Sequence, residues 1–160
     1  MLRRSLLVAV VMALVVAVSG VGAGEKRVFR VGIIGLDTSH VVAFTQLMND
    51  PAKGYGCKVV AGYPGGSPDI ESSIGRVKGY TDTLRDKHGV EIVDSIEALV
   101  QKVDGVLLES VDGRPHLAQV KPVIAAKKPV FIDKPMAGSL ADVLEVFRLA
   151  KENKVPCWSS

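Results

Sequence analysis

The stretch Val130-Phe131-Ile132-Asp133-Lys134-Pro135 predicts a short buried strand that stops at a fixed point. Its first three residues are apolar, and Pro135 ends the strand because proline has no N–H for the hydrogen-bond ladder. In open α/β sheets, ligands bind just beyond the carboxyl ends of the strands. Asp133 and Lys134 therefore lie at a ligand-binding crevice if the rest of the chain forms such a sheet.

The rest of the chain alternates short apolar strands with amphipathic helices. We expect strands at 28–34, 58–61, 90–93, 105–108, 130–132 and 155–158. Helices are expected at about 41–48, 81–88, 94–103, 115–124 and 139–150, with Asp94 and Ser139 as N-caps. The last helix is expected to bury Leu140, Val143, Leu144, Phe147 and Ala150. This alternation predicts an α/β fold, a single Rossmann-like domain over residues 28–160 with a doubly wound, mostly parallel sheet.

Residues 1–23 have the composition of a secretory signal peptide. Arg3 and Arg4 form a basic start, an apolar run at 5–18 follows, and small residues precede a cleavage site after Ala23. We therefore expect export to the periplasm or the outside of the cell. An uncleaved leader would instead tether the protein to a membrane, which is the only contact with a membrane that we expect.

Charge and cysteine content argue against nucleic acids and metals as ligands. Removal of Arg3 and Arg4 lowers the basic residues from 20 to 18, against 17 acidic ones, so the net charge is +1. No basic block with interleaved aromatic residues is present, and we expect no nucleic-acid partner. Cys57 and Cys157 lack the spacing of a metal motif and have no histidine cluster beside them, so we expect buried free thiols and no metal site.

The turn after the first strand is Gly35-Leu36-Asp37-Thr38-Ser39-His40. Dinucleotide-binding folds have G-x-G-x-x-G here, whose glycines let backbone N–H groups approach the pyrophosphate. Gly35 keeps the first position, but Asp37 and His40 replace the second and third glycines. A carboxylate about 4 Å from a phosphate costs roughly 1 to 4 kcal/mol, depending on the effective dielectric. The fingerprint is thus weakened, and Asp37 and Thr38 could instead serve as helix caps.

Two other features bear on a nucleotide. The second strand ends at Gly62-Tyr63-Pro64, without the carboxylate that usually holds the ribose hydroxyls, so NAD and NADP both remain open. After the fourth strand come four polar residues, which form either a solvated loop or a polar wall for a sugar-like ligand: Glu109, Asp112, Arg114 and His116.

Three segments together resemble the glucose–fructose oxidoreductase/inositol dehydrogenase (Gfo/Idh/MocA) family: Val31-Gly32-Ile33-Ile34-Gly35, Pro115-His116 and Asp133-Lys134-Pro135. The resemblance covers about residues 28–160. It implies that Lys134 is a catalytic residue near the nicotinamide and the substrate. The resemblance also implies a lesser role near the cofactor for His116. Together with the turn and the strand ends, the cofactor-binding residues that we expect are Gly35, Asp37, Thr38, Ser39, His40, Glu109, His116 and Asp133.

Members of that family continue into a C-terminal domain that supplies the acid/base and the oligomer interface, and we expect this chain to lack that domain. We therefore expect a truncated protein, inactive alone, that is the cofactor-binding half of an exported NAD(P)-dependent oxidoreductase. It would act on a sugar or polyol by hydride transfer, and oligomers would need the missing domain. The alternative is a non-enzymatic Rossmann-like module that has lost dinucleotide binding and binds a carbohydrate or a protein partner.

Overall fold

The computed structural model describes residues 27–160, so the expected signal peptide and tether lie outside the described residues. The strands are β1 Phe29–Ile34, β2 Cys57–Tyr63, β3 Glu91–Ile92, β4 Gly105–Leu108, β5 Val130–Ile132 and β6 Cys157–Ser159. The helices are α2 His40–Asn49, the short 3-10 helix η1 Pro51–Lys53, α3 Glu71–His88, α4 Ile96–Lys102, α5 His116–Ala125 and α6 Leu140–Asn153.

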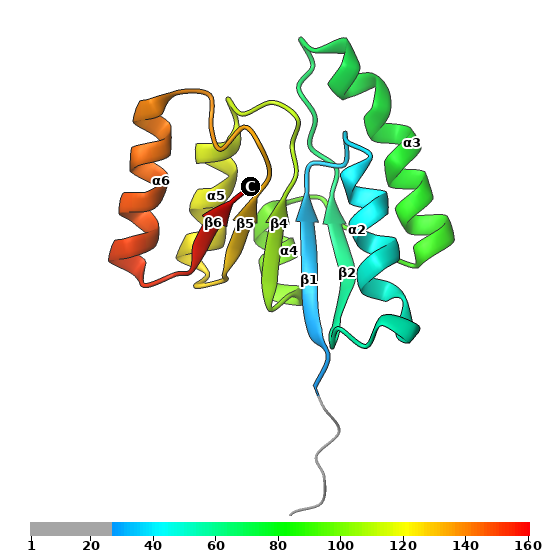
Figure 1. Ribbon diagram of the computed structural model, residues 1–160. Helices are drawn as coiled ribbons and strands as arrows, with labels where there is room; N and C mark the ends of the chain where they lie inside the picture. The colour runs from blue at the N-terminus through cyan, green and yellow to red at the C-terminus, as the bar shows by residue number, and fades with distance from the viewer. Residues whose placement is uncertain (1–26) are drawn as a thin grey trace, which may run out of the picture.

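The six strands form one sheet in the order β3-β2-β1-β4-β5-β6, and every neighbouring pair is parallel. Helices α2 and α3 cover one face, and α4, α5 and α6 cover the other (Figure 1). The predicted doubly wound α/β fold is therefore confirmed. The strand order reverses between β1 and β4, and such a switch point opens a crevice at the carboxyl ends of the two strands.

The sheet separates two apolar cores, because successive strand residues point to opposite faces. Ile33 and Val59 are buried on the side of α2 and α3, where they pack in one cluster with Leu84. Ile34 and Ile132 are buried in the larger cluster on the other side. Both faces of β1 are thus covered, which holds the turn that follows it in a fixed position.

Helix α3 begins at Glu71, ten residues before the expected start at residue 81. Its buried side follows a helical spacing, with Ser73 and Leu84 buried and Val77 and Tyr80 partly buried between them. The sequence signal was weak because this stretch is polar and contains two glycines. The prediction was wrong here because a single shallow apolar stripe is enough once the helix lies against α2.

The two predicted N-caps have different outcomes. The N-cap of α4 is Ser95, whose hydroxyl accepts a hydrogen bond from the Ala98 N–H at 3.1 Å, and not Asp94. The cap of α6 is confirmed, since the Ser139 hydroxyl accepts from the Asp142 N–H.

The expected buried stripe of α6 is largely wrong. Leu140 is 73% exposed and Leu144 62% exposed, and Phe147 is also exposed, whereas Val146 and Ala150 are buried. The helix carries apolar residues on two adjacent faces, and the face with the smaller side chains fits against the sheet and α5.

Two findings concern the expected thiols and membrane contacts. Cys57 and Cys157 are free, as expected, but they are half-buried rather than fully buried. Within the described residues 27–160, we find no helix that combines the length and the apolar character needed to cross a bilayer.

Candidate functional site

Three side chains that follow different strands meet beside the switch point. His40 begins α2, Glu109 follows β4 and Asp133 follows β5. The Nδ1 atom of His40 lies 2.6 Å from Oδ2 of Asp133 and 3.8 Å from Oε2 of Glu109. We call these three residues the His40 cluster. Each of them was expected from the sequence to bind the cofactor, but their contact with one another was not predicted.

Glu109 is the most perturbed group of the cluster. Its side chain is buried, and neither carboxyl oxygen has a hydrogen-bond partner among the described residues. Burial raises the pKa of Glu109 to about 8, helped by the negative charge of Asp133 and opposed by the positive charge of Lys134. At neutral pH, Glu109 is therefore mostly protonated unless another cation lies beside it.

Asp133 behaves in the opposite way. Burial raises the pKa of Asp133, but hydrogen bonds from His40 and from the Lys134 N–H outweigh burial and hold the pKa below its usual range. The Ser160 hydroxyl donates to the other carboxylate oxygen at 3.3 Å. The cluster thus contains one ionised and one mainly neutral carboxyl group.

Lys134 is exposed at the edge of this cluster, in the loop after β5, where the Lys134–Pro135 peptide bond is cis. Its charge is close enough to lower the pKa of Glu109. The structure therefore brings the expected catalytic residue together with His40, Glu109 and Asp133.

Gly35 has a structural reason to be glycine. Its φ is +85°, and a Cβ here would lie 2.3 Å from the hydroxyl and 2.4 Å from the N–H nitrogen of Ser110. The N–H groups of Gly35 and Leu36 already donate to the carbonyls of Tyr63 and Pro64 at 3.0 and 2.7 Å. These two hydrogen bonds connect the turn after β1 to the end of β2 and the residue that follows it.

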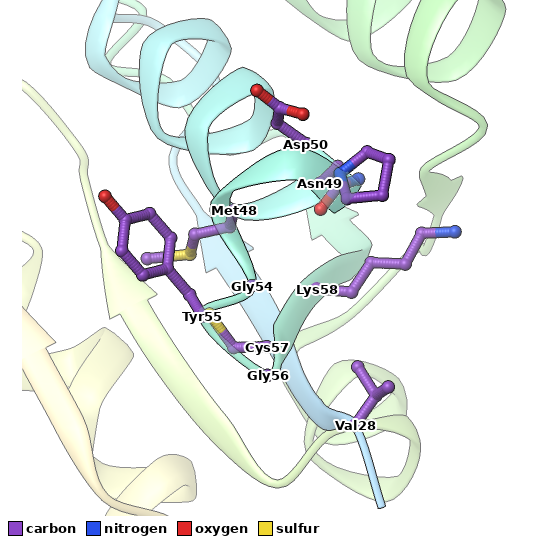
Figure 2. A pocket seen from close by; sticks show the side chains of 10 residues that line it. Val28, Met48, Asn49, Asp50, Gly54, Tyr55, Gly56, Cys57 and Lys58 are labelled. Carbon is purple, nitrogen blue, oxygen red and sulfur yellow. The ribbon is translucent and has the colours of Figure 1, made fainter. Parts of the chain in front are cut away.

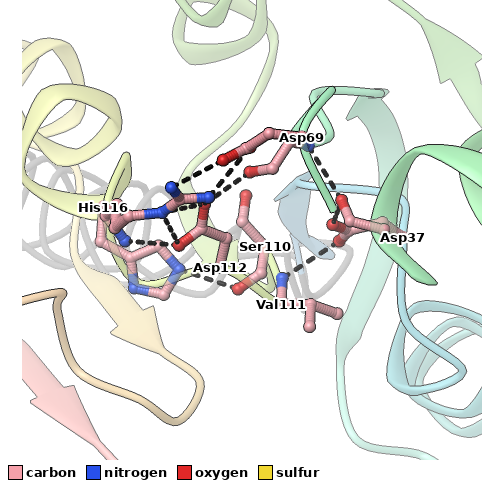
Figure 3. A network of polar contacts seen from close by, with 9 residues as sticks. Asp37, Asp69, Ser110, Val111, Asp112 and His116 are labelled. Carbon is pink, nitrogen blue, oxygen red and sulfur yellow. Dashed lines mark hydrogen bonds and ion pairs between the residues drawn. The ribbon is translucent and has the colours of Figure 1, made fainter. Parts of the chain in front are cut away.

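Asp37 is not a helix cap, contrary to one expectation. It is buried, and its carboxylate accepts hydrogen bonds from the Ser73 hydroxyl at 2.5 Å and from the Val111 N–H at 3.2 Å (Figure 3). Both oxygens are therefore held by protein groups. Helix α2 instead starts after Ser39, which makes no side-chain capping bond. Thr38 accepts a long bond of 3.4 Å from the His40 N–H.

The loop after β2 is fastened to the segment after β4 by charged groups. Arg114 donates to Asp69 at 2.8 and 2.9 Å and to Asp112 at 2.9 and 3.0 Å. The Ser67 hydroxyl also donates to Asp112, at 2.7 Å (Figure 3). The Arg114 guanidinium holds the pKa of Asp112 well below its usual range. Asp112 and Arg114 therefore fix a loop; the expectation that they line a polar wall stays a prediction.

His116 is fully buried between two loops. Its Nε2 lies 2.8 Å from the Ser110 carbonyl oxygen, and its Nδ1 lies 3.2 Å from that of Met136. The imidazole thereby connects the segments that follow β4 and β5. The structure does not place His116 or Asp37 in contact with the His40 cluster, and their direct roles at a cofactor stay predictions.

A cavity of about 410 Å³ lies elsewhere, near the ends of α2 and η1 and the start of β2 (Figure 2). Met48, Tyr55, Cys57 and Lys58 are among the residues that line it. It lies at the amino end of β2, whereas the predicted site residues lie at the carboxyl ends of the strands. None of the predicted site residues lines this cavity.

Comparisons with known proteins agree with the fold. A sequence profile described as "Oxidoreductase family, NAD-binding Rossmann fold" matches residues 29–160. No curated protein sequence matches the chain.

Solved structures share the fold. A dehydrogenase from Clostridium difficile is 21% identical with a TM-score of 0.62. A scyllo-inositol dehydrogenase from Lactobacillus casei, with bound NAD(H) and scyllo-inositol, is 20% identical with a TM-score of 0.65. A biliverdin reductase from Synechocystis, in complex with biliverdin and NADP+, is 22% identical with a TM-score of 0.59. These matches cover 82–85% of this chain but only 36–39% of the other chains.

Proposed function

Since the chain belongs to the Gfo/Idh/MocA oxidoreductase family, with its NAD-binding Rossmann fold, we propose that it is the cofactor-binding half of an NAD(P)-dependent oxidoreductase. The substrate would be a sugar or polyol, oxidised or reduced by hydride transfer. The observation that carries this proposal is the switch point between β1 and β4. There, Gly35 with its positive φ leads into α2, and Lys134 lies nearby in the loop after β5. The chain spans less than two fifths of the similar solved structures, so activity and substrate are proposed for the whole protein.

The start of α2 fits a dinucleotide pyrophosphate. Its N-cap, Ser39, makes no side-chain hydrogen bond, and no acidic residue lies in the first turn of the helix. Free N–H groups and the helix dipole at such an end favour phosphate. The carboxylate of Asp37 accepts hydrogen bonds from Ser73 and Val111, which reduces its steric conflict with a phosphate at this turn. Thr38 and Ser39 would therefore hold the phosphates.

Lys134 would act on the substrate. A bound nicotinamide supplies the hydride chemistry. The Lys134 ammonium is exposed at the crevice and would donate a hydrogen bond to the reacting oxygen, which stabilises alkoxide character. The Lys134 N–H donates a hydrogen bond to Asp133, and the charge of Lys134 acts on Glu109, so these two acids set the electrostatic environment of the lysine.

The proposal is tested by titrating the chain with NAD+, NADH, NADP+ and NADPH by isothermal calorimetry. We expect micromolar binding of at least one of the four. Ser39→Asp should weaken that binding by about tenfold or more through charge repulsion, while stabilising the helix as a good N-cap. Ser72→Asp, at the exposed start of α3, is the matched control and should leave affinity unchanged. No binding of any nucleotide at millimolar concentration would refute the proposal.

The second candidate is a non-enzymatic module that binds a carbohydrate or a protein. It is favoured by the loop after β2, which Arg114 joins to the segment after β4 through Asp69 and Asp112. The contact of His40 with Asp133 also joins the start of α2 to the end of β5. Carbohydrate binding without nucleotide binding in the same titrations would favour this candidate.

We also propose export, which rests on the composition of residues 1–23. Mass spectrometry of the protein from its native cells should find a mature N-terminus at Gly24. An intact Met1 in a membrane fraction would support the tether instead.

A further inference from the structure

Within the described part of the chain, no hydrogen bond compensates the burial of Glu109. The residue is 1% exposed, and both of its carboxyl oxygens lack a hydrogen-bond partner among residues 27–160. Burying a carboxyl group without hydrogen-bond partners is unfavourable, and it is more unfavourable if the group is ionised. The side chain points at His40 and Asp133, which are themselves ligand types for metals. A buried carboxyl group that has no hydrogen-bond partner and faces two metal-binding side chains indicates a site for a cation.

The donor atoms of the His40 cluster already converge. One ligand atom from each of His40, Glu109 and Asp133 lies within 4.8 Å of the other two. The distances from His40 Nδ1 are 2.6 Å to Asp133 and 3.8 Å to Glu109. Ligand atoms bound to one ion at about 2.0 to 2.2 Å lie roughly 3 Å apart. Side-chain adjustments of less than about 1 Å would therefore create a common centre.

We propose that His40, Glu109 and Asp133 bind a divalent first-row metal ion of the Zn²⁺ or Mn²⁺ type. One imidazole and two carboxylates suit these ions, and the cluster contains no thiolate that would favour Cu(I). Two carboxylates would neutralise the dication and relieve the buried charge. Three protein ligands leave coordination positions for water or for the hydroxyl oxygens of a small molecule. The His40 side chain is 39% exposed, so the ion can enter from solvent.

No metal site was expected from the sequence, because the cysteines lack metal-motif spacing and have no histidine cluster beside them. Here the ligands come from three strand ends, and His40 and Asp133 are 93 residues apart. The proposal does not depend on nucleotide binding. It assigns the cluster a role that stands even if the chain binds no NAD or NADP.

The test is a calorimetric titration of the full chain with Zn²⁺ and Mn²⁺, without nucleotide, after treatment with EDTA. Wild type should bind one ion. The near-isosteric variants Glu109→Gln and Asp133→Asn should each bind more than about tenfold more weakly, since each loses a charged ligand. His88→Ala and Glu97→Gln, which change a histidine and an exposed acid outside the cluster, should match wild type. Thermal melts confirm that each variant is folded.

A measurement on wild type avoids any dependence on variant folding. The chain has three histidines, so their ring nitrogens can be followed by nitrogen-15 NMR. Added Zn²⁺ should shift His40 Nδ1 strongly and leave His88 unmoved. The proposal is overturned if wild type binds neither ion at millimolar concentration. Equal binding by wild type and both cluster variants, or a shift at His88 alone, would overturn it as well.

Discussion

Replacing Asp37 with glycine tests whether this residue holds the crevice together. Its carboxylate accepts hydrogen bonds from the Ser73 hydroxyl and the Val111 N–H in a buried setting. Hydrogen bonds to a charged group contribute about 1.5 to 3 kcal/mol each, so Asp37→Gly should lower the free energy of unfolding by about 3 to 6 kcal/mol. A simple helix cap changed to glycine would cost only about a few tenths of a kcal/mol.

The assay is urea unfolding at pH 7, followed by circular dichroism. Asp37→Asn should give an intermediate loss, because the amide keeps one acceptor oxygen for one of the two donors. A loss below about 1 kcal/mol for Asp37→Gly, within the range for a cap, would refute the reasoning. It would mean that the loops after β1 and β4 hold together without this carboxylate.

Three further predictions concern the described elements. Ser95→Ala should lower the free energy of unfolding in urea by about 1 kcal/mol because it removes the cap of α4, whereas Asp94→Ala should leave it almost unchanged. The reverse order would identify Asp94 as the cap. Val146→Ala should lower the free energy of unfolding by about 2 kcal/mol and Leu144→Ala by less than about 0.5. Equal losses would contradict the observed burial of Val146 and exposure of Leu144. The pKa of Asp112 lies below its usual range because Arg114 donates hydrogen bonds to it. Asp112 therefore adds to the free energy of unfolding above the unfolded pKa near 4, and this contribution is lost as the pH falls through the folded pKa. Asp112→Asn should therefore lose less stability than wild type between about pH 4 and pH 2, and identical acid profiles would rule out this contribution.

The fold could be predicted because both faces of the sheet are covered, which makes the strands continuous apolar runs. The start of α3 could not, because its stripe contains a buried serine and its sequence contains two exposed glycines. The cap of α4 was missed by one residue, since Asp94 and Ser95 are both good capping types and backbone geometry decides between them.

The location of the site followed from the strand ends, but its pairings did not. Asp37 bonds to a residue 36 positions away, and His40 bonds to one 93 positions away. Such distances in sequence carry no periodic signal, so only the folded chain shows which polar groups meet. Polar residues after neighbouring parallel strands were the available clue, and this clue did place His40, Glu109 and Asp133 at one edge.

The central claim is that the crevice at the start of α2 binds a nicotinamide dinucleotide. Its most direct test is amide NMR of the isotopically labelled chain during separate titrations with NADH and NADPH. The account predicts that one of the two shifts the N–H signals of Thr38, Ser39 and Lys134 in a saturable way. Unchanged signals with both nucleotides, or shifts confined to the distant cavity around Tyr55, would contradict it.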